Sequence, residues 1–172
     1  FFLGVKMIII AGLGNPGKEY VNTRHNVGFM AIDFLCAPDS VWKKEKQALT
    51  TRSADNKIIY AKPQTFMNNS GESVALLMQF YKIPLENLIV IHDDMDLPNG
   101  VVRTKIGGGS AGHNGIKSID SVVGNEYKRI RIGIDHPRNL HLQTNPADWV
   151  LGRFSDEQLK QIMDTVEKLV IF

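Results

Sequence analysis

Residues 12–29 read GLGNPGKEYVNTRHNVGF and follow residues 7–11, a short β-branched run that is typical of a buried strand. Three kinds of site can begin with glycines in this arrangement. Gly12, Gly14 and Gly17 match the letters of a dinucleotide-binding motif, and residues 12–18 match most of a P-loop. The third possibility is a turn that carries a polar catalytic group.

The residues around these glycines disfavour both nucleotide motifs. A P-loop needs Ser or Thr after its lysine to reach magnesium, but Glu19 follows Lys18 and puts a negative charge where phosphates would lie. A dinucleotide motif needs a helix that begins inside the glycines, whereas Pro16 and Gly17 predict a turn. The acid expected about 20 residues further on would be Asp33, which lies in an apolar helical pattern. A nucleotide-binding α/β protein is therefore kept only as an alternative.

Four blocks of the sequence, followed by a shorter fifth, resemble the bacterial peptidyl-tRNA hydrolase family. They are co-ordered and cover most of the chain, so they are far more specific than a lone glycine motif. The resemblance implies a monomeric enzyme that hydrolyses the ester between a peptidyl group and the 3′ end of tRNA, and a twisted mixed sheet with helices packed around it. The blocks are GLGNPGKEYVNTRHNVGF (12–29), KPQTFMNNSGESV (62–74), HDDMDLPNG (92–100), KIGGGSAGHNG (105–115) and RIRIG (129–133).

Length and composition set the broad class. A chain of 172 residues with 43% hydrophobic content can bury one core, so we expect one domain over residues 7–172. Residues 1–6 precede a methionine that begins the first strand, and we interpret them as a possible expression remnant or upstream start. Cys36 is the only cysteine, which excludes an intrachain disulfide and makes a reducing cytoplasm the default. No apolar run approaches the ~20 residues of a membrane-spanning helix.

The apolar periodicity predicts strands interleaved with helices. The proline at position 98 and the glycine at position 100 predict a hairpin between two strands. Interleaved elements with at least one hairpin indicate a single three-layer α/β domain with a mixed β-sheet. Asn69 with Glu72, and Ser155 with Gln158, are capping-box patterns. The expected strands are 7–11, 57–61, 88–91, 101–106 and 129–134, and the expected helices are 26–37, 69–81, 115–123 and one after residue 155 whose apolar face includes Val170.

Three polar side chains follow three expected strands. Asn15 comes after the first, Asn68 after the second and Asp93 after the third. Ligands of open α/β sheets gather outside the carboxyl ends of the strands, so the three residues are expected to meet in one cleft. Each asparagine also has a purely structural interpretation, since Asn15 precedes a proline turn and Asn68 lies next to a helix start.

His25 is the candidate whose chemistry suits neutral pH, because an imidazole can take a proton from water. Asp93 would hold the other ring nitrogen and stabilise the imidazolium. A protein nucleophile is not expected, because no Gly-x-Ser-x-Gly motif is present and Cys36 lies in an apolar helix. Ester hydrolysis by water needs no cofactor. The alternative is that His25 is only a polar residue at a helix start. The residues leave the two interpretations open, and the resemblance to the family's catalytic histidine favours the catalytic one.

A metal site is not expected. His92 lies with Asp93, Asp94 and Asp96 within five residues, but their spacing matches no ligand pattern, and the last two are better interpreted as turn residues. His92 and His113 are weaker catalytic candidates than His25.

The net charge of +2 is too small to indicate a nucleic-acid partner, but basic residues concentrate in one region. Residues 101–140 hold seven basic and three acidic side chains, an excess of +4 that predicts a phosphate-facing patch or an ordinary solvated face. A non-catalytic RNA-binding module is therefore a further alternative. The glycine-rich residues 107–112 could cradle phosphate or form a mobile lid. Family resemblance implies that Lys105 and Arg131 hold tRNA phosphate, that Asn114 holds substrate or water, and that Tyr20, Asn26 and Met67 contact the peptide side next to Asn68.

Overall fold

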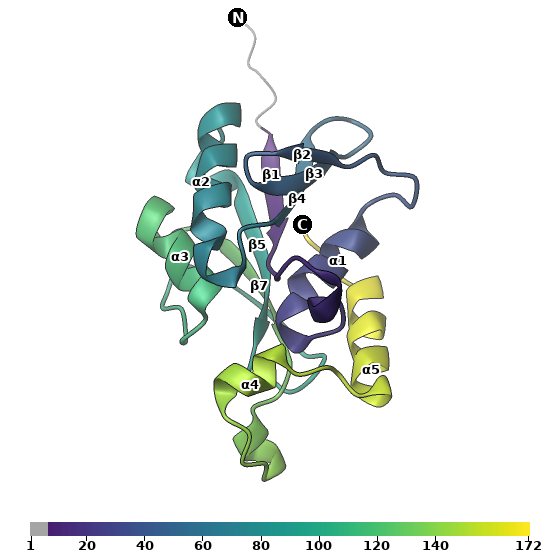
Figure 1. Cartoon of the computed structure of the whole chain (residues 1–172). Coiled ribbons are helices and arrows are strands. Elements are labelled where there is room, and N and C mark those ends of the chain that lie inside the picture. Colours follow the sequence, from purple (N-terminus) through teal and green to yellow (C-terminus); the bar gives the residue numbers. More distant parts are fainter. Residues whose placement is uncertain (1–6) are drawn as a thin grey trace, which may run out of the picture.

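A seven-stranded mixed sheet forms the middle layer of the computed structural model, which describes residues 7–172 (Figure 1). The strand order is β2-β3-β4-β1-β5-β7-β6. Four central strands are parallel: β1 (Ile8–Gly12), β4 (Ile58–Pro63), β5 (Leu88–Asp94) and β7 (Lys128–Gly133). Three outer strands are antiparallel to their neighbours: β2 (Lys43–Glu45), β3 (Ala48–Arg52) and β6 (Val102–Ile106). Residues 1–6, for which an expression remnant or upstream start was expected, lie outside the described residues.

Helices cover both faces of this sheet (Figure 1). Alternate residues of β1 point to opposite faces, so Ile9 packs in one apolar cluster and Ile10 in the other. The first cluster joins the sheet to α2 (Ser70–Tyr81) and α3 (Asn114–Val123). The second joins it to α1 (Val27–Leu35), α4 (Pro146–Leu151) and α5 (Asp156–Glu167). The three-layer α/β architecture with a mixed sheet is therefore confirmed.

The hairpin predicted at residues 98–100 is wrong, although β6 itself was expected. The chain does turn there, but β6 pairs with β7, which lies between β6 and β5. The Gly100 N–H donates to the Gly133 carbonyl at 2.9 Å, so the turn is held by the end of β7. The hairpins of the sheet are instead β2 to β3 and β3 to β4, and β2 and β3 were missed by the sequence analysis. β6 is also antiparallel, but to β7.

Helix ends show where local sequence signals predicted the structure and where they did not. The capping box of Ser155 and Gln158 is present at the start of α5. No side-chain cap forms at Asn69, because a 3₁₀ turn (Met67–Asn69) leads directly into α2. Val170 is 75% exposed, contrary to expectation, because α5 ends at Glu167 and Ile171 is buried instead.

The glycines of the opening motif serve close packing. A Cβ on Gly12 would lie 2.1 Å from the Gly28 carbonyl oxygen of α1, and a Cβ on Gly14 would lie 2.7 Å from the Phe29 ring. The segment after Gly17 is a single 3₁₀ turn (Lys18–Tyr20), and α1 begins only at Val27. The glycines therefore do not lead into a helix whose N-terminus could bind a pyrophosphate, which removes the basis of the dinucleotide alternative.

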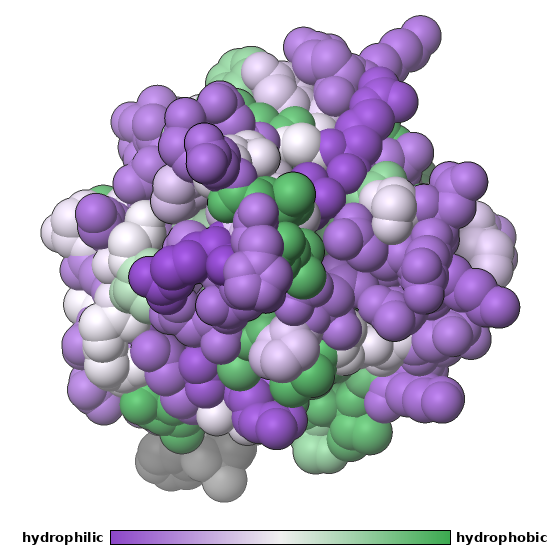
Figure 2. Space-filling view, turned by 90° about the horizontal axis from the view of Figure 1, so that it is seen from below, coloured by the Kyte–Doolittle hydropathy of each residue, from purple (hydrophilic) through white to green (hydrophobic). Residues whose placement is uncertain are grey.

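The parallel strands all run toward the lower edge of the sheet in Figure 1, where α4 lies. Seen from below, this face shows hydrophobic side chains in its middle between hydrophilic ones (Figure 2). Within residues 7–172, no helix has both the length and the apolar composition needed to cross a membrane.

Candidate active site

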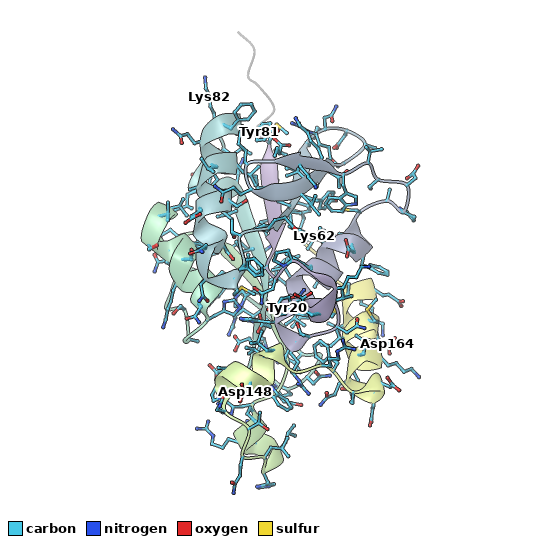
Figure 3. All side chains as sticks on the ribbon, in the orientation of Figure 1. Tyr20, Lys62, Tyr81, Lys82, Asp148 and Asp164 are labelled. Carbon is cyan, nitrogen blue, oxygen red and sulfur yellow. The ribbon has the colours of Figure 1, made fainter. Side chains whose placement is uncertain are left out.

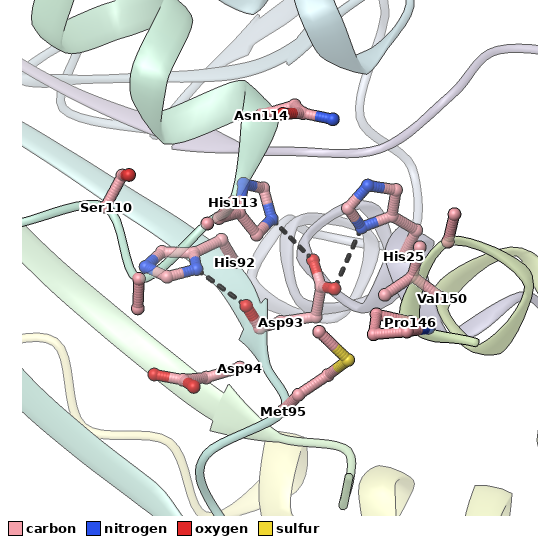
Figure 4. A pocket seen from close by; sticks show the side chains of 13 residues that line it. His25, His92, Asp93, Asp94, Met95, Ser110, His113, Asn114, Pro146 and Val150 are labelled. Atoms are coloured by element: carbon pink, nitrogen blue, oxygen red, sulfur yellow. Dashed lines mark hydrogen bonds and ion pairs between the residues drawn. The ribbon is translucent and has the colours of Figure 1, made fainter. Parts of the chain in front are cut away.

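A pocket of about 250 Å³ opens at the carboxyl ends of the strands (Figure 4). Its floor is the end of β5 from His92 to Asp94 with Met95 just after it, and its walls come from the loop at residues 110–113, from the start of α3 and from α4. His25 enters from a 3₁₀ turn (Arg24–Asn26) that immediately precedes α1. The pocket therefore joins segments that are far apart in the sequence.

Asp93 lies between two histidines at the centre of this pocket (Figure 4). Its Oδ2 is 2.8 Å from His25 Nδ1, and its Oδ1 is 2.8 Å from His113 Nε2. Burial alone raises the pKa of this carboxyl, but the charges and hydrogen bonds of the two histidines outweigh it and hold the pKa below its usual range. Asp93 is thus an ionised acceptor, and the His25 Nδ1–H is held against it. The other ring nitrogen of His25 points away from Asp93.

His113 is more central than the sequence analysis expected. Its Nδ1 accepts a hydrogen bond from the Ile116 N–H at 3.2 Å, which makes it the N-cap of α3. Because that nitrogen accepts, the proton of the neutral ring lies on Nε2 and is donated to Asp93. The signal in the sequence was a histidine placed between a glycine-rich loop and a helix start, but nothing local indicated that it would reach Asp93.

His92 has a structural role in this arrangement. Its Nδ1–H donates to the Asp93 carbonyl at 2.7 Å, and its ring packs 4.8 Å from the His113 ring. Burial, reinforced by the nearby His113, lowers the pKa of His92 to about 3. His92 is therefore neutral near pH 7 and supports the backbone of β5.

His25, Asp93 and His113 are also the side chains best placed to hold a metal ion, with their ligand atoms within 4.8 Å of one another. Ligands at about 2.1 Å from a tetrahedral metal lie about 3.5 Å apart, so the 2.8 Å contacts between Asp93 and the histidines would have to lengthen. Both histidine N–H groups already donate to Asp93, and a metal would displace both bonds. The arrangement suits proton transfer better than metal binding.

Asn15 lies in a second hydrogen-bonded group beside the pocket. Its Oδ1 accepts from the Met67 N–H at 2.7 Å, and its backbone N–H donates to Asn26 Oδ1 at 2.8 Å. Asn26 returns a bond from Nδ2 to the Asn15 carbonyl at 2.9 Å. These bonds fix the Asn15 carboxamide, and within residues 7–172 its NH₂ group makes no hydrogen bond to the protein. Asn26 and Met67 are both buried and act as its supports.

The other expected substrate residues are more exposed. Asn68 follows Met67 on the surface, and Asn114 lines the pocket at the start of α3. Tyr20 lies at the level of the carboxyl ends of the strands (Figure 3). Its ring is 6.4 Å from the Phe66 ring and nearly perpendicular to it.

Phe66 was not singled out by the sequence. Its φ of 61° is in the region that disfavours side chains, and 53% of its surface is exposed. This backbone turn aims the next N–H, that of Met67, at Asn15. Strain of this kind persists where the surroundings enforce it and is common at functional sites.

Lys105 and Arg131 share one face of the β6–β7 pair, as expected. Lys105 is directly opposite Arg129 in the register, so it is diagonal to Arg131. Lys105 Nζ donates to the Gly109 carbonyl at 3.0 Å, and Arg131 Nη1 lies 3.4 Å from Asp94 Oδ2. Both cations therefore have weak partners that a phosphate could replace.

Arg129 does not belong to the exposed basic patch. It is 1% exposed, pairs with Asp120 at 3.1 Å and donates to the Gly109 carbonyl at 2.8 Å. The glycine-rich loop is thus held at Gly109 by two cations, Lys105 and Arg129. The carbonyl oxygens of this loop accept hydrogen bonds from the two cations in this structure.

The fold and site define an α/β protein with a buried histidine–aspartate–histidine cluster at the carboxyl edge of a mixed sheet. Comparison with known proteins makes this specific. The chain belongs to the peptidyl-tRNA hydrolase family, whose sequence profile matches residues 9–172.

Relatives named peptidyl-tRNA hydrolase are similar over nearly the whole chain. The one from Rickettsia prowazekii is 47% identical over 168 residues, covering 95% of this chain and 89% of the relative. The one from Aliarcobacter butzleri is 47% identical over 167 residues, covering 95% and 88%. A crystal structure of peptidyl-tRNA hydrolase from Acinetobacter baumannii superposes with a TM-score of 0.86 at 34% identity, covering 94% of this chain and 83% of that one. The family resemblance and the fold expected from it are confirmed.

Proposed function

We propose that this protein hydrolyses the ester between a peptidyl group and the 3′ oxygen of tRNA by a water that His25 activates. Family membership supports the reaction, and the 2.8 Å contact of His25 with the buried Asp93 supports the base. The contact leaves one ring nitrogen of His25 free to take a proton from water.

The reaction then runs in two steps. His25 takes a proton from water as the oxygen attacks the ester carbonyl, which gives a tetrahedral intermediate and an imidazolium stabilised by Asp93. Collapse of the intermediate breaks the bond to the tRNA 3′ oxygen, and that oxygen receives the proton back from His25. The products are free tRNA and a peptide with a free carboxyl group.

Amide groups are the candidates for stabilising the oxyanion. Asn15 is one candidate, because its Oδ1 is occupied by Met67 and its NH₂ group is the part that remains for substrate. Asn68 and Asn114 are further donors at the same edge, and Asn114 lines the pocket itself.

Substrate binding is assigned around this centre. The peptide lies toward Tyr20, Asn26 and Met67. Of these three residues, Asn26 lines a groove of about 420 Å³ that also runs past Asn15. The tRNA terminal phosphate lies toward Lys105 and Arg131. The protein works in the cytoplasm as a monomer, as one domain over residues 7–172, without a cofactor and without an obligate protein partner.

The deciding experiment is turnover of peptidyl-tRNA by wild type and by His25→Ala. Loss of a positioned base should lower kcat by about 10²–10⁴-fold while tRNA binding and the fold are retained. Near-normal turnover would remove His25 from the mechanism. Tight binding of tRNA by a wild type without turnover would favour the RNA-binding module, and a response to free nucleotide would revive the nucleotide alternative.

A further inference from the structure

Arg24, the residue before His25, is a buried cation whose side-chain partners are uncharged. Only 7% of its surface is exposed. Nη1 donates to the Trp149 carbonyl at 3.2 Å, and Nη2 donates to Gln158 Oε1 at 3.1 Å. Burial lowers the pKa of the guanidinium, and the charge of Asp135 only partly offsets this. Burying a charge against neutral groups is unfavourable, so the position calls for an explanation beyond packing.

The strongest contact of Arg24 is with α4. Its guanidinium carbon lies 3.5 Å from the centre of the Trp149 ring, which is a close cation–π stack. Its backbone N–H also donates to the Gly152 carbonyl at 3.0 Å, just after α4. Both ends of the same residue therefore bind α4 to the turn that carries His25.

The wall that α4 provides is apolar. Pro146, Ala147 and Val150 line the pocket, and Pro146 and Val150 lie beside His25 (Figure 4). With only six residues, α4 is too short to be stable without tertiary contacts. Trp149 is its buried anchor: Nε1 donates to the Asp135 carbonyl at 2.9 Å, and one ring face is covered by Arg24.

We propose that Arg24 is a positioning residue for ester hydrolysis, which clamps α4 over His25 so that Pro146, Ala147 and Val150 exclude bulk water from the His25–Asp93 pair. A site closed to water strengthens the hydrogen bonds inside it and keeps the base in one orientation. This inference rests on the proposed function in one respect, namely that His25 is the base.

Two variants disturb the clamp in different ways. Arg24→Gln removes the charge and the stack. Gly152→Ala keeps Arg24 but places a Cβ 2.6 Å from Nη1, and Gly152 has an ordinary φ of −75°, so alanine is acceptable to the backbone there. The matched control is Gln158→Ala, which removes the other partner of Arg24 on α5 and weakens the α5 cap without touching Trp149. All are made in a Trp42→Phe background, because Trp42 and Trp149 are the only tryptophans and fluorescence then reports α4 alone.

The expected result is a split between kcat and KM on peptidyl-tRNA. Arg24→Gln and Gly152→Ala should lower kcat by about 10–100-fold with KM changed less than about threefold, and Trp149 emission should shift to the red. Gln158→Ala should lose thermal stability but keep kcat within about threefold and the emission unchanged. If Arg24→Gln does not fold, Gly152→Ala decides the question.

Equal kcat values in Gly152→Ala and Gln158→Ala, at temperatures where both are folded, would overturn the inference. A loss of activity in Gly152→Ala that comes from a raised KM with kcat unchanged would also overturn it. The emission reports docking of α4 whether or not His25 is the base. An active His25→Ala variant would therefore reveal failure of the proposed base, whereas unshifted emission in Arg24→Gln would reveal failure of the clamp.

Discussion

The edge around Asp93 and the cationic face of β6 and β7 differ in how their polar groups are held. Asp93 is 2% exposed and accepts two hydrogen bonds of 2.8 Å, so both of its oxygens are oriented before substrate arrives. Arg131 is partly exposed and lies 3.4 Å from Asp94 Oδ2, which is longer than an ordinary hydrogen bond. Preorganised groups in a buried site act on the chemical step, whereas loosely held surface cations can exchange their partners for a ligand. Damage at the first region should appear in kcat, and damage at the second in KM.

The largest effect among the remaining tests is expected for Asp93→Asn. Asparagine keeps the shape but removes the charge that stabilises the His25 imidazolium in the proposed mechanism, and it leaves only one of the two oxygens that accept from the histidines. We expect kcat on peptidyl-tRNA to fall by about 10²-fold, less than in His25→Ala. Asp94→Asn is the matched control, because Asp94 is a neighbouring buried carboxylate that pairs with Arg131 instead. A severe Asp94→Asn beside a silent Asp93→Asn would mean that the wrong carboxylate was assigned.

Lys105→Ala and Arg131→Ala should act on binding. Each removes one phosphate contact, so KM for peptidyl-tRNA should rise and the slope of log affinity against log salt should decrease in magnitude by about 1. Hydrolysis of a short peptidyl-ester analogue without the tRNA body should be nearly unchanged. Equal loss with both substrates would show that these residues act in the cleft or in folding, and the phosphate assignment would be withdrawn.

The pH dependence of the free energy of unfolding should reveal the lowered pKa of His92. Its pKa is about 3 in the folded protein and about 6.5 when unfolded, so the unfolded state binds more protons between these values. The free energy of unfolding should therefore fall as pH is lowered from about 6.5 toward 3, by at most about 1.4 kcal/mol per pH unit from this group. His92→Asn keeps an N–H donor for the Asp93 carbonyl but cannot titrate. Denaturant unfolding at several pH values should show a flatter profile in this variant, and identical profiles would contradict the assignment.

Chelation should have the smallest effect. Because both histidine N–H groups already donate to Asp93, we expect EDTA to leave turnover unchanged. Recovery of a chelated, inactive enzyme by zinc or magnesium would instead assign a metal to the histidine–aspartate cluster.

Local signals predicted those elements that local energetics specify. The apolar period of residues 27–35 and the capping box of Ser155 and Gln158 are properties of neighbouring residues, and both were found. The meeting of the β1, β4 and β5 ends also followed from sequence order, because parallel strands present their carboxyl ends at one edge. The short β2 and β3 strands carried no such signal, since β2 is three residues of Lys, Lys and Glu that are stabilised by their neighbours.

The amino-acid sequence by itself determined the α/β class, the family and the edge of the sheet that carries the candidate site, where His25 and Asp93 meet. Apart from the expected His25–Asp93 pair, only the tertiary structure decided which side chains touch. His113 reaches Asp93 across 20 residues, and Arg24 reaches Trp149 across 125. Such contacts depend on where β7 lies in the sheet and where α4 docks. Strand order and helix docking are decided by the total apolar surface that the whole core buries. Periodicity reports which face of an element is buried, but it carries no information about which distant side chain will meet it there.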